Sequence, residues 1–381
     1  MRDRTGVCRH GPARLRYAPD AVEITCYSST FSTLPASASP GANPGPSDPA
    51  MTTSPAIPVP PAGPVFTADC AQGLLAFDGA DAAAFLHGQL STDVAAMAVG
   101  DAAWSSYNSP KGRMLGTLLL CRLAPDAFRA FVAADLAEPL RRRLAMFVLR
   151  AKVAVADLSA GGRRFGVAGP SAADAARTAL GLATAPAPGH AVAAGDALAV
   201  VTPDGRCLVH VPAGEEEAVA ARLAAHARPM AAGAWALFGI RAGVPAIAAA
   251  TADLFVPQAA NWDLVGGVSF RKGCYPGQEI VARMQYLGRL KERLYAFHLD
   301  GPPPAPATPL YGDVFGDQAC GTVVNAAPAP AGGSDLLAVA QIAAVAGGPL
   351  RVGAPDGPAL VAGALPYPVP APKEPERPKL R

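Results

Sequence analysis

Short apolar runs separated by glycine, proline and polar residues occur through the middle of the chain. Seven such runs predict strands, at 73–77, 115–123, 128–132, 152–157, 164–168, 197–202 and 206–211. Apolar residues at helical spacing predict helices after Asp81, from about 136 to 148, from 171 to 181 and from 215 to 226. Strands and helices mix without strict alternation, which predicts an α+β fold.

Polar residues at helix ends support these helices. Asp135 and Glu138 have the spacing of a capping box, ahead of the apolar stripe Leu136, Leu140, Leu144 and Val148. Three arginines at 141–143 lie beside that stripe; we interpret them as a solvated helix face, with a ligand site as the alternative. Ser171 and Gly181 cap the third helix, and the acidic start of the fourth suits the helix dipole.

The end of the chain shows a different pattern. Runs at 293–299, 321–325 and 336–342, separated by Gly and Pro turns, predict a small all-β barrel or sandwich. Residues 34–64 hold almost no large apolar side chains, too few to offset the entropy of ordering. We therefore predict that residues 1–63 are a disordered or mis-assigned extension, with Met51 as an alternative start. Residues 64–290 are predicted to form an α+β region of two subdomains that meet near residue 160. A β-barrel domain at 291–367 and a disordered tail at 368–381 are predicted to follow.

Composition narrows the class of protein. The 381 residues carry a net charge of +2, which argues against direct binding of nucleic acid. No apolar run of about 18 residues occurs, so we expect a cytoplasmic protein without a membrane helix. Seven widely spaced cysteines fit a reducing compartment and, with scattered histidines, predict no metal site.

The densest candidate stretch is KGCYPGQE at 272–279. Gly273 and Gly277 permit a tight turn, and a helix is predicted to begin at Gln278. Cys274 then precedes a helix N-terminus beside basic residues, and both features favour the thiolate. Cys274 is therefore the candidate reactive thiol, with a buried cysteine in a glycine-rich turn as the alternative. The supporting motif residues are Lys272, Gly273, Tyr275, Gly277, Gln278, Glu279 and Arg283.

The motif is very similar to the signature of the YgfZ family of folate-binding proteins. FVPQ at 255–258, GGVSF at 266–270, GIRAGVP at 239–245, GQLSTDV at 88–94 and NSPKGRML at 108–115 resemble the same family, so the resemblance covers about 70–366. It implies the fold of the glycine-cleavage T-protein, with three domains around a central site for tetrahydrofolate. It also implies support of [4Fe–4S] clusters in client enzymes, such as radical enzymes that modify tRNA, with those clients and the cluster-assembly machinery as partners.

The resemblance also implies folate contacts. Trp235 matches a position implicated in folate binding, where an aromatic ring would stack on a pterin. Gln72 falls where the family can carry Trp. Because Gln cannot stack on a pterin as Trp does, a folate contact of Gln72 would differ from the family's. Asn108, Lys111 and Arg113 are polar candidates, and Lys111 or Arg113 would pair the glutamate tail of folate, with plain surface charge as the alternative.

One departure from the T-protein bears on activity. T-proteins carry two adjacent acids after a Gly-Gly turn, and the matching residues here are Leu115 and Gly116, which cannot move a proton. Asp93 is a possible substitute. We therefore expect a monomeric folate-binding maintenance factor that is no classical enzyme. The alternatives are a folate-dependent aminomethyltransferase-like protein and a scaffold that binds no small molecule.

Overall fold

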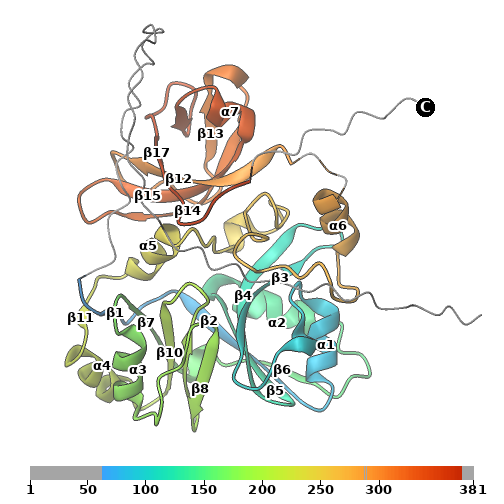
Figure 1. Ribbon diagram of the computed structural model, residues 1–381, viewed down its shortest axis with the longest axis vertical. Helices are drawn as coiled ribbons and strands as arrows, with labels where there is room; N and C mark the ends of the chain where they lie inside the picture. Colours follow the sequence, from blue (N-terminus) through green and yellow to red (C-terminus); the bar gives the residue numbers. More distant parts are fainter. Residues whose placement is uncertain (1–61, 287, 289, 371–381) are drawn as a thin grey trace, which may run out of the picture. The chain divides into compact units, whose positions relative to one another are not determined.

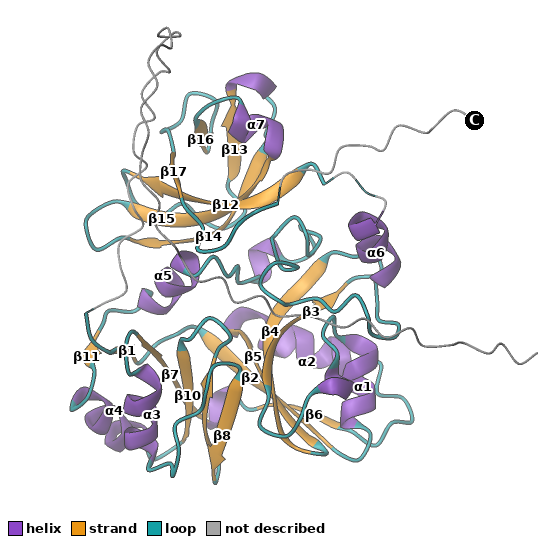
Figure 2. Cartoon of the chain, viewed as in Figure 1, coloured by secondary structure: helices purple, strands orange, loops and turns teal. Residues whose placement is uncertain are grey.

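The computed structural model describes residues 62–370 except 287 and 289 (Figure 1). The predicted extension 1–63 and tail 368–381 lie outside this range, apart from residues 62, 63 and 368–370. The described residues belong to one compact unit, Thr53–Arg381, so the predicted domain limits within it stay predictions. Three β-sheets and seven α-helices make up the described part, which confirms the mixed α+β class (Figure 2).

The first sheet has five antiparallel strands in the order β3-β4-β5-β2-β6. They span Ala102–Asn108, Met114–Ala124, Ala127–Ala133, Gln72–Asp78 and Ala154–Asp157, with helices α1 (Ala82–Gln89) and α2 (Ala137–Ala145) packed against them. In β4, Leu118 and Leu120 enter the core under these helices, whereas Leu119 and Cys121 enter a second core. Burial on both faces explains why β4 is almost continuously apolar.

The second sheet has six strands in the order β11-β1-β7-β10-β9-β8. They span Arg228–Pro229, Val65–Thr67, Gly162–Ala168, Cys207–Pro212, Ala197–Val201 and His190–Ala194. Helices α3 (Ala172–Leu180) and α4 (Glu216–Ala224) share a core with one face. From the other face, Leu198 and Leu208 share a core with Leu119 of the first sheet, so the two sheets are packed together through their side chains.

The third sheet has the order β16-β13-β14-β15-β12-β17 and is curled into a half-barrel. Its strands span Leu350–Val352, Pro309–Gly312, Gly321–Pro328, Ser334–Gln341, Glu292–Leu299 and Val361–Gly363, with α7 at Ile342–Ala346. The pairing of β14 with β15 shifts register between Val323 and Asn325, and such an irregularity bends a strand locally. Leu337 and Val339 join the core of the first sheet, so this face of the half-barrel is also buried.

Two helices belong to the segment that leads into the third sheet. Helix α5 (Ala234–Arg241) packs against β14 and β15, and α6 (Gln278–Tyr286) follows the motif stretch. Between them the chain is mostly irregular and is held by buried polar contacts. Arg293 pairs with Asp263 at 2.7 Å, and the Asn261 amide donates to the Leu294 carbonyl.

Two predicted details of α2 are wrong. Residues 134–136 form a 3-10 turn, and no side chain caps α2. The Asp135 carboxylate instead accepts a hydrogen bond from the backbone N–H of Ala249, so it binds a distant loop and does not cap its own helix. The helix ends at Ala145, and Val148 packs against the core from beyond its end.

Candidate functional site

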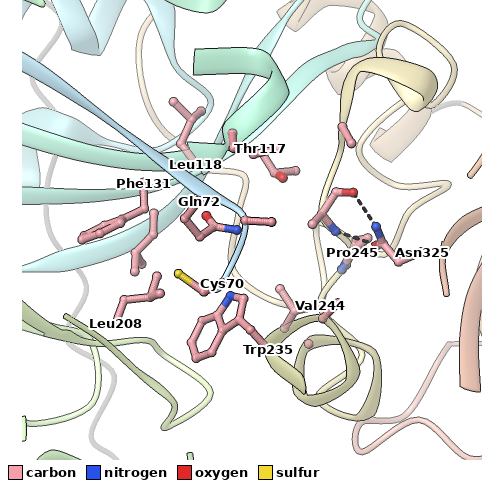
Figure 3. Close-up of a pocket in the computed structure, with 18 of the residues that line it drawn as sticks. Cys70, Gln72, Thr117, Leu118, Phe131, Leu208, Trp235, Val244, Pro245 and Asn325 are labelled. Atoms are coloured by element: carbon pink, nitrogen blue, oxygen red, sulfur yellow. Dashed lines mark hydrogen bonds between the residues drawn. The ribbon is translucent and has the colours of Figure 1, made fainter. Parts of the chain in front are cut away.

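A cavity of about 390 Å³ lies where all three sheets approach α5. Its walls include Trp104 of β3, Phe131 of β5, Leu208 of β10, Trp235 of α5 and Asn325 of β14 (Figure 3). The walls are largely apolar and aromatic, and the volume is within the usual range for a small-molecule site. Residues from all three sheets are therefore needed to enclose the cavity.

Trp235 holds a defined position in this wall. Its side chain is only 6% exposed, and a Cβ on Gly166 of β7 would lie 2.4 Å from the ring, so the ring packs directly on that strand. The Arg206 guanidinium lies 4.5 Å from the ring centroid in a cation–π contact. Arg206 is fixed in turn by a nearly buried ion pair with Asp204. The sequence indicated Trp235 but gave no signal for its Arg206 partner.

Most polar groups in the cavity wall already have partners. Asn325 exchanges two hydrogen bonds of 2.8 Å with the backbone of Ala246, and Thr117 accepts from Ile247. One oxygen of Asp135 is bonded to Ala249. Gln72 points toward the cavity, and its side-chain amide has no hydrogen-bond partner among the described residues (Figure 3). Gln72 is therefore the amide in this wall that is free to bind a ligand.

The other predicted folate contacts lie elsewhere. Asn108, Lys111 and Arg113 do not line the cavity. Asn108 is 1% exposed, and neither atom of its amide has a partner. Lys111 is exposed, and Arg113 donates to the carbonyl of Leu254 at 2.6 Å. Only Trp235 and Gln72 of the predicted folate contacts are therefore brought together at this cavity.

The predicted motif packs against the turn that carries Lys111. Gly277 has φ +76°, and a Cβ there would lie 2.4 Å from the Ser109 carbonyl oxygen and 2.6 Å from Gly112 Cα. Gly112 has φ +72°, and a Cβ there would lie 2.8 Å from Ile280 Cβ. Glycine is needed at both positions because the two backbones touch. Two stretches separated by more than 150 residues in sequence thus form one unit.

Lys272 anchors the motif on a second side. Its Nζ donates to the carbonyls of His87 and Leu90 at the C-terminal end of α1, and lies 4.7 Å from the Tyr275 ring centroid. A cation is favourable there because the helix end presents unpaired carbonyls. Burial lowers the pKa of Lys272 to about 8, opposed by the charges of Asp93 and Cys274. Lys272 therefore ties the motif to the end of α1 through hydrogen bonds, while its burial disfavours the charged form.

Cys274 is exposed at the surface of this unit, whereas the other described cysteines are buried. Burial raises the pKa of Cys70 and of Cys207 to about 12, so these thiols are poor nucleophiles. The imidazole of His87 lies beside Gly273, and its Nδ1 is 3.4 Å from Asp93. Asp93 is thus near the motif and does not line the cavity.

The remaining motif residues divide between burial and exposure. Tyr275 is buried, and burial raises its pKa to about 12. Gln278 donates to the carbonyl of Lys272 at 3.4 Å, which closes the turn. Glu279 and Arg283 are exposed on α6. The buried residues hold the turn in shape, and the exposed ones are open to solvent, as Cys274 is.

The positions that match the T-protein acids lie on β4. Leu115 is partly buried, and Gly116 lies against Leu140, where a Cβ would be 2.8 Å from a methyl carbon. Neither lines the cavity, although the next residue, Thr117, does. Asp135 is the carboxylate in the cavity wall, and the sequence indicated it only as a helix cap.

No helix in the described residues is both long and apolar enough to cross a membrane. No group of three or more His, Cys, Asp or Glu side chains in residues 62–370, with the two gaps at 287 and 289, is arranged to hold a metal ion.

The chain is similar to several curated proteins named tRNA-modifying protein YgfZ. It is 32% identical over 248 residues to the protein of Enterobacter sp., covering 62% of this chain and 75% of the relative. It is 32% identical over 219 residues to that of Edwardsiella ictaluri, covering 57% and 66%. The match to Escherichia coli is 30% identical over 253 residues, covering 62% and 75%. No protein-family model matches the chain.

The fold is similar to a solved enzyme structure. The aminomethyltransferase T of the glycine cleavage system from Bartonella henselae superposes with a TM-score of 0.65, covering 80% of this chain and 86% of that one. The sequences are 19% identical, so this likeness concerns the fold and not the activity. It confirms the predicted T-protein-like fold, whereas the three domains and the central folate site stay predictions.

Proposed function

Since the chain belongs to the family of tRNA-modifying proteins YgfZ, we propose that it binds tetrahydrofolate or a derivative and supports [4Fe–4S] clusters in client enzymes. Cys274 is the functional thiol in this proposal. The clients are enzymes such as radical tRNA-modifying enzymes, and the clusters are their cargo. The protein acts in the cytoplasm as a monomer, with clients and cluster-assembly proteins as partners and without direct contact to nucleic acid.

The cavity described above supports the folate part of the proposal. Its walls are aromatic and apolar, which suits a flat heterocycle, and its volume exceeds that of one ring system. Trp235 would supply an aromatic surface, and the free amide of Gln72 would bond the polar edge of the ring. Arg206 adds a positive charge at the same wall. When bound, tetrahydrofolate supplies a carrier for one-carbon groups.

The exposed thiol is the observation that carries the cluster part of the proposal. Cys274 is the accessible cysteine of the described residues, and it lies on a turn fixed by the Gly112–Gly277 contact and by Lys272. A thiol that is exposed while its backbone is rigid is suited to contact a partner protein. The absence of acids at 115 and 116 argues against aminomethyl transfer at the matching positions.

The test uses a strain that lacks this gene. The activity of a [4Fe–4S] tRNA-thiolating enzyme is measured after complementation with wild type, Cys274→Ser and Trp235→Ala. Cys207→Ala, which removes a buried thiol of the second sheet, and Trp235→Phe, which keeps a ring, are the matched controls. We expect wild type and both controls to restore activity, while Cys274→Ser does not. A deletion that leaves the enzyme untouched would sink the cluster role.

A second candidate function rests on Asp135. This carboxylate lines the cavity, and only one of its oxygens is bonded to Ala249. It is placed to hold a proton near a bound ligand, which supports a folate-dependent one-carbon transferase. Formation of methylene-tetrahydrofolate from an aminomethyl donor, lost in Asp135→Asn, would favour this candidate over the first.

A further inference from the structure

Three segments that are far apart in sequence meet around Cys274. The turn at 109–113 touches Gly277 and Ile280 through its own Gly112. The same turn reaches Leu254, because the Arg113 guanidinium donates to the Leu254 carbonyl at 2.6 Å. In Figure 1, α6 is drawn beside the adjoining ends of β3 and β4, which this turn connects. These contacts join the three segments beside the motif that carries Cys274.

This surface is partly apolar. Leu254 is 39% exposed and Ile280 is 37% exposed, and each contacts a residue of the turn. Each of these side chains would offer an aliphatic contact to a bound partner. Ile280 contacts Gly112 and the Leu254 carbonyl accepts from Arg113, so both residues lie beside the turn at 109–113.

The same surface carries unpaired positive charge. Lys111, Arg113 and Arg271 are exposed, and none of them makes a salt bridge within the described residues. The acidic side chains on the surrounding elements are Asp253, which accepts from the Ser109 hydroxyl, Glu279 of α6, and Asp93, which lies 3.4 Å from His87 Nδ1. With Arg283 of α6, four exposed cations stand against three carboxylates, and no hydrogen bond or salt bridge within the described residues holds the side chain of Lys111.

We propose that this surface is a docking site for an acidic, partly apolar segment of a protein partner that approaches the thiol. We name it the Cys274 face, and it consists of Lys111, Arg113, Leu254, Arg271, Cys274 and Ile280. The inference rests on the proposed function, whose clients it would recruit. It also gives Lys111 and Arg113 a role that fits their position outside the cavity, in place of pairing the folate tail.

A protein segment suits this face better than RNA. Phosphate binding gains from many cations through counterion release, and here four exposed cations share the surface with three carboxylates. The two aliphatic side chains would instead pack against apolar residues of a partner, while its acidic residues meet the cations. A second copy of this chain would bring like charges together.

The probe is a synthetic peptide of Glu and Leu with one cysteine activated by a thionitrobenzoate group. The Cys274 thiolate attacks the peptide sulfur, a mixed disulfide forms and thionitrobenzoate leaves, so its absorbance reports the rate. A matched peptide has Lys in place of Glu. We expect wild type to react roughly tenfold faster with the acidic peptide at low salt. That preference should shrink at high salt because exposed charges are screened.

The deciding variant is Lys111→Glu combined with Arg271→Glu, which should abolish the preference for the acidic peptide. Arg150→Glu combined with Arg228→Glu makes the same charge change on other exposed positions and should keep the preference. The ratio of the two peptide rates cancels any change in the reactivity of the thiol itself. An unchanged ratio in the deciding variant would overturn the proposal.

Fluorescence anisotropy of the acidic peptide without its leaving group measures docking independently of thiol chemistry. A thiol that never reacts would defeat the proposed role of Cys274, and anisotropy would still decide whether the face docks the peptide. Bulk tRNA is the competitor. Displacement of the peptide by tRNA, with tRNA affinity lost in the deciding variant, would assign the face to RNA and overturn the inference.

Discussion

The contact between Gly277 and the 109–113 turn yields a quantitative prediction. In Gly277→Ala, the new Cβ would lie 2.4 Å from the Ser109 carbonyl oxygen, which real structures do not tolerate, at a φ of +76°. A left-handed conformation costs a non-glycine residue roughly 1–2 kcal/mol. Overpacking typically adds about 1–3 kcal/mol. We expect Gly277→Ala to lower the free energy of unfolding by about 2–5 kcal/mol.

Gly266 offers a matched control for this prediction. It has φ +81°, but a Cβ there would meet nothing within 4 Å. Gly266→Ala therefore carries the conformational cost without the crowding, and we expect a loss of only about 1–2 kcal/mol. The effect of alanine on the unfolded chain is common to both variants and cancels in the comparison.

Urea unfolding of the two variants and the wild type measures these losses. Alkylation of Cys274 in the folded protein gives a second, local readout, because a displaced turn would change access to the thiol. A larger loss in Gly277→Ala than in Gly266→Ala is required by the reasoning. Equal losses would refute it, since they would mean that the two backbones do not touch as described.

Further predictions follow from the burial of single groups. Burial holds the pKa of Lys272 at about 8, below its ordinary 10.5, so the unfolded chain binds more protons between these pH values. The stability of wild type relative to Lys272→Met should therefore rise as pH increases through that window, by about 3 kcal/mol in pH-dependent urea unfolding, and a flat difference would contradict it. Iodoacetamide at neutral pH should label Cys274 before any other described cysteine, as read by peptide mass spectrometry. Trp235→Ala should weaken tetrahydrofolate binding about tenfold or more in equilibrium dialysis, with Trp235→Phe retaining most of it; equal affinities would remove the ring from the site.

Much of the fold was predictable because a buried segment has a recognisable apolar pattern in the sequence. Strand β4 is apolar on both faces because each face has its own core, and the run at 115–123 carried that signal. Strand β3 was missed, since Ser105 and Ser106 are buried within it and are bonded to Ser91 instead of forming an apolar pattern. A buried hydroxyl with a distant partner cannot be told from an exposed one in sequence.

The candidate site, too, was predictable from the sequence only in part. The motif identified Cys274 and the glycines beside it, because a tight turn and a thiol before a helix need those residue types. The sequence alone thus determined the family, the mixed fold class and the motif. Only the tertiary structure decided that Arg206 stacks on Trp235, that Asp135 faces the cavity and that Lys111 lies on the surface with Cys274. Those relations depend on contacts between segments more than a hundred residues apart or on which way a side chain points, and no local pattern of residues encodes either.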